Sequence, residues 1–422
     1  MDSVYIRGGI ALQGQVGIQG SKNAVLPVLA ATLLAEGTSV IENCPRLADV
    51  YHMQTLLQSL GCSVSRDKKK LRVNTDGMRE FNALSGDMPK EAVESMRSSI
   101  ILLGALINKI GEVELAYPGG CVIGERPIDI HVEALKQLHV SFEEKSYGLH
   151  AYTKGLQGAD ITLPFPSVGA TENVLLAAVG AKGTTVIRGA AREPEIVTLC
   201  RFLSACGADI TGEGSTTIII QGRKRLYAAD FAIPGDRIVA GTYLCACLAV
   251  GGEVLLMEAP MWQMQATKKV TEAMGAVWQE TDKGLYIQRG ERLKAPKKLT
   301  TAPFPGFPTD MQSLFLPVLA LAEGSCRVEE KIFENRFHII PDLNAMGAKI
   351  KQIDAKTAKV QGVEQLTGAR VKAKELRGGA ALVIAGAAAK GETIVDDCGY
   401  IERGYENICS DLRELGVRIY GV

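Results

Sequence analysis

A long apolar segment recurs six times along this chain of 422 residues, with a period of about 70 residues. Each copy is apolar almost all round, so a folded domain has to bury it on every side as a central helix. A glycine follows each copy, and we expect it to end the helix. The segments are residues 21–36, 97–110, 168–182, 236–250, 309–323 and 377–390, followed by Gly37, Gly111, Gly183, Gly251, Gly324 and Gly391.

A second pattern follows each apolar segment. A short β-type run comes first, as at residues 38–41, 184–187 and 393–395, and an amphipathic helix comes next. Two further strand-like runs complete the copy, for example residues 217–221 and 359–361. Five of the amphipathic helices are predicted to end at a glycine (Gly61, Gly207, Gly275, Gly347 and Gly416), whereas the second copy has Leu138-His139 there and must close differently.

The two ends of the chain predict its domain organisation. The sixth copy stops at residues 419–422 without its last strands, while residues 1–20 have no helix before them, so we expect residues 1–20 to complete the sixth copy. The fold class is then α/β (α+β), with two inside-out domains of three repeats, residues 21–230 and residues 1–20 plus 231–422. Two chain crossings would make a hinge over a cleft that holds the active site. The alternative is a single compact solenoid without a cleft.

Charge and cysteine content narrow the class of protein. Lys and Arg number 47 and Asp and Glu number 47, so no general field attracts the chain to nucleic acid or an anionic membrane. The apolar runs stop well short of the roughly 20 residues that span a bilayer, and the start resembles no signal peptide, which predicts a cytoplasmic protein. Ten cysteines without a CxxC pair indicate reduced core residues. We expect no metal, no cofactor and no obligatory protein partner.

Cations stand where the apolar helices begin. Lys22, Arg97, Arg237 and Arg377 lie at helix starts, where the positive end of the helix dipole disfavours a cation unless an anion lies between them. If the helices of a domain run parallel, these groups gather into a site for phosphates or carboxylates. The alternative for each is solvation or pairing with a nearby carboxylate.

Three more charged residues are candidates. Asp310, in FPTDMQ, is either a helix N-cap or a general base facing the cationic pocket. Arg336 and Arg403 each lie near the end of a strand-like run and follow an acid within two residues. Each of these arginines therefore has a local ion pair as its alternative.

The segment PGGCVIGERP, from Pro118, has glycines and prolines on both sides of Cys121. This composition predicts a mobile loop, and a neighbouring cation, Arg126, would lower the thiol pKa and make Cys121 reactive. An incidental loop thiol is the alternative. No Walker A loop, GxGxxG after a strand or HExxH is found, and none of the five His is placed as the partner of a nucleophile.

Nine motifs now support a resemblance. They are GSKNAVLPVLAATLLAEG from Gly20, MRSSI from Met96, PGGCVIGERPIDIH from Pro118, SVGATENVLLAA from Ser167, AREPEI from Ala191, FPTDMQ from Phe307, FENRF from Phe333, ELRGGAALV from Glu375 and IERGYE from Ile401. With them the chain resembles the enolpyruvyl transferases from end to end. The resemblance implies two inside-out α/β domains and transfer of the enolpyruvyl group of phosphoenolpyruvate to the 3′-hydroxyl of UDP-N-acetylglucosamine, in peptidoglycan precursor synthesis.

The resemblance also implies roles for individual residues. Cys121 would give a proton to the phosphoenolpyruvate methylene and can form a covalent adduct, Asp310 would take the sugar hydroxyl proton, and Lys22, Arg126 and Arg403 would hold the phosphate and carboxylate of phosphoenolpyruvate. The nucleotide-sugar site would be lined by Asn23, Arg97, Arg126, Pro127, Ile128, Asp129, Ile130, Ser167, Val168, Gly169 and Ile332, with Arg336 and Arg377 completing the charges.

The sequence departs from the family pattern at two positions, and two alternative functions stay open. Glu375 and Glu402 stand where the family often has Asp, which lengthens each acid by one methylene. One alternative is the branch of the family that acts on shikimate 3-phosphate, although that branch normally lacks the loop thiol. Another is a paralogue that binds UDP-N-acetylglucosamine as a sensor without turnover.

Overall fold

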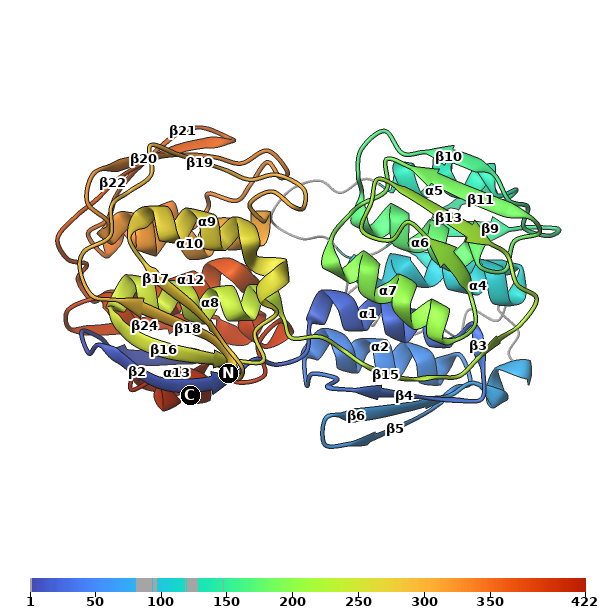
Figure 1. Ribbon diagram of the computed structural model, residues 1–422, viewed down its shortest axis with the longest axis horizontal. Helices are drawn as coiled ribbons and strands as arrows, with labels where there is room; N and C mark the ends of the chain where they lie inside the picture. The colour runs from blue at the N-terminus through green and yellow to red at the C-terminus, as the bar shows by residue number, and fades with distance from the viewer. Residues whose placement is uncertain (1, 81–92, 94–96, 118, 120–127, 147) are drawn as a thin grey trace. The chain divides into compact units, whose positions relative to one another are not determined.

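The computed structural model describes residues 2–80, 93, 97–117, 119, 128–146 and 148–422 (Figure 1). The chain divides into two compact units. The unit made of Met1–Gln19 and Gly235–Val422 is called the terminal unit below, and the unit made of Gly20–Gly120 and Arg126–Pro234 is called the central unit.

Three apolar helices form the core of each unit. In the terminal unit they pack against one another inside the sheets (Figure 1), and every residue of α8 except its first and last is buried. These six helices are α8 (Arg237–Val250), α10 (Thr309–Leu321) and α12 (Leu376–Ala388) in the terminal unit, and α1 (Lys22–Thr32), α4 (Leu102–Ile110) and α6 (Val168–Ala178) in the central unit. The expected buried helices are therefore confirmed.

Each amphipathic helix packs one apolar side inward. They are α2 (Ala48–Ser59), α5 (Asp129–Gln137), α7 (Pro194–Ala205), α9 (Gln265–Met274), α11 (Ile340–Ala345) and α13 (Ile408–Glu414). The five glycines predicted to end them have φ between 86° and 103°, the left-handed region that glycine tolerates best. In the second copy His139 takes the same conformation with φ of 67°, which shows how that helix closes without a glycine. Short 3₁₀ helices are η1 (Asp76–Glu80), η3 (Arg97–Ile101), η4 (Met261–Met264) and η5 (Cys398–Arg403).

The terminal unit has three four-stranded sheets of the same design, in the orders β23-β24-β1-β25, β17-β18-β16-β2 and β19-β20-β22-β21. In each, a parallel pair is extended by antiparallel strands. The strands are β1 (Ser3–Arg7), β2 (Leu12–Gly17), β16 (Gly252–Met257), β17 (Val277–Thr281), β18 (Gly284–Arg289), β19 (Lys298–Thr300), β20 (Ser325–Glu329), β21 (Lys349–Asp354), β22 (Thr357–Gln361), β23 (Arg370–Lys372), β24 (Glu392–Asp396) and β25 (Arg418–Gly421).

The central unit repeats this design in the orders β15-β4-β6-β5 and β10-β11-β13-β12, with a three-stranded sheet β7-β9-β8 and a short pair β14-β3 among its described residues. The strands are β3 (Ala35–Glu36), β4 (Thr38–Glu42), β5 (Ser63–Asp67), β6 (Lys70–Asn74), β7 (Glu112–Ala116), β8 (Ser141–Lys145), β9 (Gly148–Tyr152), β10 (Asp160–Thr162), β11 (Thr184–Arg188), β12 (Asp209–Thr211), β13 (Thr217–Gln221), β14 (Leu226–Tyr227) and β15 (Asp230–Ala232).

The first strand of the chain completes the last repeat. β1 lies between β24 and β25, with Val4 opposite Val395 on one side and Gly421 on the other. It holds the place that β22 holds in its own sheet. The prediction that residues 1–20 complete the sixth copy is confirmed for β1, whereas β2 pairs with β16 and so belongs to the fourth copy.

The glycines after the apolar helices are a partial correction. Gly111 and Gly251 are the C-caps of α4 and α8. In the other four copies the helix ends three to five residues earlier: α10, for example, ends at Leu321 although its glycine is Gly324. These four glycines also have positive φ, but they turn the chain into the following strand instead of ending the helix.

Two further observations concern membrane-spanning helices and cysteines. In the described part of the chain no helix is long and apolar enough to cross a membrane. The nine cysteines that the structure describes are all buried and form no disulfide with one another, and burial raises the pKa of thiols such as Cys200 to about 12.

Candidate active site

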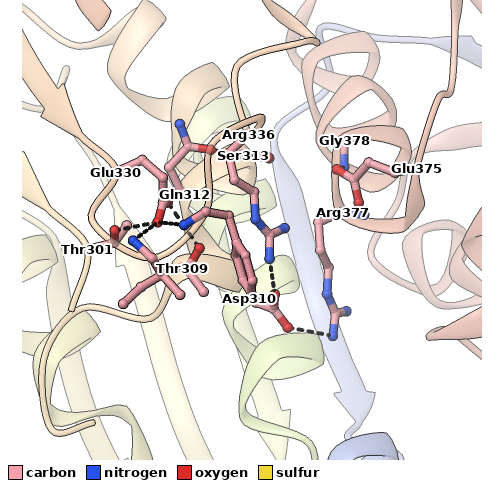
Figure 2. Close-up of polar contacts among 12 residues, drawn as sticks. Thr301, Thr309, Asp310, Gln312, Ser313, Glu330, Arg336, Glu375, Arg377 and Gly378 are labelled. Carbon is pink, nitrogen blue, oxygen red and sulfur yellow. Dashed lines mark hydrogen bonds and ion pairs between the residues drawn. The ribbon is translucent and has the colours of Figure 1, made fainter. Parts of the chain in front are cut away.

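Asp310, in the first turn of α10, lies between two buried arginines of the terminal unit (Figure 2). Nη2 of Arg336 donates a hydrogen bond to Oδ1 at 2.5 Å, and Nη2 of Arg377 lies 3.5 Å from Oδ2. The arginine side chains are 1% and 4% exposed and that of Asp310 is 27% exposed. The carboxylate is therefore the part of this cluster most accessible to solvent.

This geometry corrects two expectations. Asp310 is not the N-cap of α10, because Pro308 holds that position. Arg336 lies in a loop after β20 and pairs with Asp310, not with the sequence-adjacent Glu334, whose carboxylate lies 3.4 Å from Lys356. Sequence proximity predicted the wrong partner because the loop directs the two neighbouring side chains to different places.

Arg377 is held by a directed chain of hydrogen bonds. Its Nη1 donates to the Tyr405 hydroxyl at 3.3 Å, and that hydroxyl lies 2.7 Å from Oγ1 of Thr242. Thr242 donates its own proton to the carbonyl of Ile238, so Tyr405 has to be the donor to Thr242. Burial raises the pKa of Tyr405, which keeps this donor protonated.

Arg377 remains charged in this buried setting. Burial acts to lower its pKa, but Tyr405 and Asp310 more than offset this and raise it above its ordinary value. The backbone is fixed as well, because Glu375 caps α12 and accepts hydrogen bonds from the amides of Arg377 and Gly378.

The cluster has unused donors. Nε of Arg336 and Nε of Arg377 are buried and have no hydrogen-bond partner among the described residues. Buried donors of this kind are normally satisfied, and guanidinium groups prefer carboxylates and phosphates. The arrangement can therefore bind an anion beside the Asp310 carboxylate.

Two other predicted residues lie in the terminal unit. Arg403 is half-buried and ends η5, a 3₁₀ helix where a strand was expected. Gln19 fixes the segment that follows, because its Nε2 donates to the carbonyl of Gly404 at 3.2 Å and its Oε1 accepts from the amide of Glu406 at 2.8 Å. The amide of Ile332 donates to Glu330 at 2.8 Å.

In the central unit Lys22 is the first residue of α1. Its Nζ lies 2.7 Å from Oδ2 of Asp49 in α2, and the two side chains are 12% and 2% exposed. Asn23 follows and is half-buried. The structure therefore shows the alternative for both cations: Lys22 pairs with Asp49, and Arg377 lies beside Asp310.

A histidine joins two predicted binding segments. Asn173 accepts the amide of Gly104 through Oδ1, so its Nδ2 has to face the carbonyl of Ile100 and Nδ1 of His131, 2.8 Å away. His131 Nδ1 is then an acceptor and Nε2 carries the proton. The ring edge lies against Gly169, where an added Cβ would be 2.9 Å from Cε1.

This contact brings the start of α5 beside the start of α6. The predicted residues in the two segments are Ile128, Asp129 and Ile130, and Ser167, Val168 and Gly169. Ser167 is the N-cap of α6, and its hydroxyl accepts the amide of Ala170 at 3.3 Å.

Four of the predicted residues are not described in full. Cys121, Arg126 and Pro127 are outside the described residues, and of Arg97 only the backbone position, at the start of η3, is described. Within the described ranges no three His, Cys, Asp or Glu side chains form a group that could hold a metal ion.

The sequence reasoning missed Asp49, Tyr405 and Glu330. Asp49 and Glu330 are acids with 2% and 0% exposure, and Tyr405 is 1% exposed. Their residue types gave no signal, because burial and partners depend on segments distant in the sequence.

The architecture defines a class of proteins. The structure of the enolpyruvyl transferase NikO from Streptomyces tendae matches with a TM-score of 0.88 at 22% identity, covering 99% of this chain and 98% of that one. A structure of EPSP synthase from Acinetobacter baumannii matches with a TM-score of 0.76 at 18% identity over 100% of both chains. The fold is therefore the inside-out α/β fold of the enolpyruvyl transferases.

Sequence comparison specifies the family. The model of EPSP synthase (3-phosphoshikimate 1-carboxyvinyltransferase) matches residues 6–412. UDP-N-acetylglucosamine 1-carboxyvinyltransferase 2 of Caldanaerobacter subterraneus subsp. tengcongensis is 45% identical over 421 residues, and UDP-N-acetylglucosamine 1-carboxyvinyltransferase of Nitratidesulfovibrio vulgaris is 43% identical over 419, each covering 99% of both chains. The chain belongs to the EPSP synthase family and is an enolpyruvyl transferase.

Proposed function

We propose that this protein transfers the enolpyruvyl group of phosphoenolpyruvate to the 3′-hydroxyl of UDP-N-acetylglucosamine and releases phosphate, the first committed step of peptidoglycan precursor synthesis in the cytoplasm. The observation that carries the proposal is the full-length similarity to relatives named for that reaction, 45% identical in one case. The buried arginines around Asp310 supply the chemistry that two anionic substrates need.

The reaction proceeds by addition and elimination. Asp310 takes the proton of the sugar hydroxyl as its oxygen bonds to C2 of phosphoenolpyruvate, while Cys121 donates a proton to the C3 methylene, which becomes a methyl group. In elimination the bond from C2 to the phosphate oxygen breaks and phosphate leaves with the proton that Asp310 took, while the methyl group returns a proton to the Cys121 thiolate and the vinyl group forms again. No net oxidation or reduction occurs, and no metal takes part in these steps.

The charged residues divide the remaining work. Lys22, Arg126 and Arg403 hold the phosphate and carboxylate of phosphoenolpyruvate, and Arg336 and Arg377 stabilise the anions beside the reacting carbon. The Ile128–Ile130 and Ser167–Gly169 segments bind the nucleotide sugar together with Asn23, Arg97, Pro127 and Ile332. The proposed domains that carry these residues are residues 21–230 and residues 1–20 plus 231–422.

Before the reaction begins, the Asp310 carboxylate is paired with Arg336 and Arg377. A carboxylate that contacts two guanidinium groups is a weak proton acceptor, because both charges favour its anionic form. An arriving anionic substrate offers Arg377 another partner, and its contact with Asp310 at 3.5 Å is the longer of the two. Release of that contact raises the basicity of Asp310 when the sugar hydroxyl is present.

The variant Asp310→Asn tests this role. We expect phosphate release from phosphoenolpyruvate with UDP-N-acetylglucosamine to fall by about 100-fold or more, as for loss of a general base. The matched control is Asp342→Asn, since Asp342 on α11 pairs with Lys374 at 2.9 Å and takes no part in the Asp310 cluster, and it should retain wild-type rates. A rate for Asp310→Asn within threefold of wild type would remove Asp310 from the mechanism.

A further inference from the structure

Glu330 directly follows β20 and is 0% exposed. Oε1 accepts hydrogen bonds from the Thr301 hydroxyl at 2.8 Å and from the amides of Ile332 and Phe333 at 2.8 and 3.2 Å. Oε2 accepts from the Thr309 hydroxyl at 3.0 Å. All four of these donors are neutral, so hydrogen bonds to hydroxyls and amides hold this buried carboxylate (Figure 2).

Three of these donors come from the two segments that form the Asp310–Arg336 ion pair, and the fourth, Thr301, directly follows β19. Thr309 is the first residue of α10 and precedes Asp310 directly. Phe333 lies three residues before Arg336, and its ring is 5.2 Å from the guanidinium carbon of Arg336. The Glu330 carboxylate thus binds the side chain of Thr309, next to Asp310, and the backbone amide of Phe333, close to Arg336.

The other repeats of the terminal unit provide an internal comparison. The acids that follow the corresponding strands β16 and β24 are Glu258 and Asp397. Both are exposed and have left-handed backbones, with φ of 60° and 57°. Of these three acids, Glu330 is the one that turns inward, where it contacts the start of α10, the central helix of its own copy.

We propose that Glu330 is a positioning residue, which holds the start of α10 and the 332–336 segment together so that Asp310, Arg336 and Ile332 keep their productive arrangement. The proposal rests on the proposed function, because it needs Asp310 to act in the reaction. A fully buried carboxylate without a cationic partner among its four contacts is costly. A role in aligning reacting groups accounts for that cost, whereas an uncharged residue could serve as a simple cap.

The sharpest test removes one hydrogen bond and leaves the shape of the site unchanged. Thr309→Val deletes the hydroxyl that links Glu330 to α10, and Thr309→Ser keeps it. The matched control is Thr393→Val, because Thr393 is a fully buried threonine of the terminal unit whose hydroxyl has no partner among the described residues. For each variant we would measure kcat and KM for both substrates by phosphate release, and the melting temperature.

Thr309→Val should lower kcat by about tenfold, the effect of one hydrogen bond to a charged group. The KM values should change less than twofold, and Thr309→Ser should return kcat to within twofold of wild type. A merely structural role would lower the melting temperature and leave kcat unchanged, and that result would overturn the proposal. So would a loss of kcat that Thr309→Ser does not restore, or an equal loss in Thr393→Val.

The two proposals fail in different ways. A wild-type chain that releases no phosphate with UDP-N-acetylglucosamine overturns the proposed function and the positioning role with it. An active wild type whose Thr309→Val variant keeps full kcat overturns the positioning role alone.

Discussion

At the scale of single residues, the buried hydroxyl groups of Tyr405 and Thr242 help to fix the position of Arg377. The chain of donors from Arg377 through Tyr405 and Thr242 ends on the carbonyl of Ile238. Each hydroxyl has one acceptor to donate to, so the direction of the chain is fixed and the guanidinium has one low-energy position.

The variant Tyr405→Phe interrupts this chain and should loosen Arg377. We expect KM for at least one of the anionic substrates to rise by about five- to tenfold, since a hydrogen bond of this kind contributes about 1–1.5 kcal/mol. The control is Tyr243→Phe: Tyr243 is equally buried but donates to Asp411 and takes no part in the hydrogen-bond chain to Arg377. It should lower the melting temperature and leave both KM values unchanged. Unchanged KM values in Tyr405→Phe would show that Arg377 does not depend on the hydroxyl.

Glu172, buried in α6, is a second residue whose ionisation matters. Burial raises its pKa well above 4.5, and the neighbouring Glu195 and Glu193 raise it further. The folded state therefore holds this proton to a higher pH than the unfolded state, which loses it above about pH 4.5. Its contribution to stability is therefore complete below that pH and is lost as the pH rises towards the folded-state pKa.

Glu172→Gln should remove this pH dependence. From pH 5 to pH 8 the free energy of unfolding of the wild type should fall relative to the variant, by at most about 1.4 kcal/mol per pH unit. Urea unfolding at several pH values measures the difference. Glu364→Gln, at a side chain that is 90% exposed, should run parallel to wild type. Parallel curves for Glu172→Gln as well would mean that Glu172 ionises normally in the folded protein.

At the scale of secondary-structure elements, the ends of the amphipathic helices offer a direct comparison between repeats. His139 is exposed and adopts φ of 67°, where the other copies have glycine. A left-handed conformation costs a residue with a side chain about 1–2 kcal/mol, partly offset by the greater freedom of glycine in the unfolded chain. The second copy therefore carries a local strain that the other copies avoid.

His139→Gly should relieve this strain and raise the free energy of unfolding by about 0.5 kcal/mol. Gly207→Ala is the reverse change at the equivalent place, with φ of 99° and no atom within 4 Å of an added Cβ, and should lower it by about 1 kcal/mol. Denaturant unfolding would measure both. Destabilisation by His139→Gly would mean that the histidine side chain contributes more than the strain costs.

Most of the secondary structure could be predicted because its signals are local. Apolar periodicity located the six central helices, and positive-φ glycines such as Gly207 and Gly275 located the ends of the amphipathic ones. Helix ends such as that of α10 were misplaced, because the short link from Leu321 to Gly324 leaves the helix to form an isolated bridge between Glu323 and Lys294.

The candidate site could be predicted only as a set of residues. The sequence placed Asp310 and Arg377 at helix starts, which brings them close once α10 and α12 pack side by side. The pairing of Arg336 with Asp310, the bond from Arg377 to Tyr405 and the bond from Thr309 to Glu330 join segments that are 21 or more residues apart in sequence. No local pattern contains that information.

At the scale of the whole molecule, the repeats divide the predicted site between the two units. The terminal unit holds Asp310, Arg336, Arg377 and Arg403, and the central unit holds Lys22 and the segments at the starts of α5 and α6.

Enolpyruvyl transfer to UDP-N-acetylglucosamine can be tested by measuring phosphate release from phosphoenolpyruvate by the purified wild-type protein. The assay is run with UDP-N-acetylglucosamine, with shikimate 3-phosphate, and with no acceptor. The account predicts release with UDP-N-acetylglucosamine alone. Release with shikimate 3-phosphate would assign the protein to the other branch of its family. Binding of UDP-N-acetylglucosamine without any release would contradict the proposed catalysis and indicate a sensor.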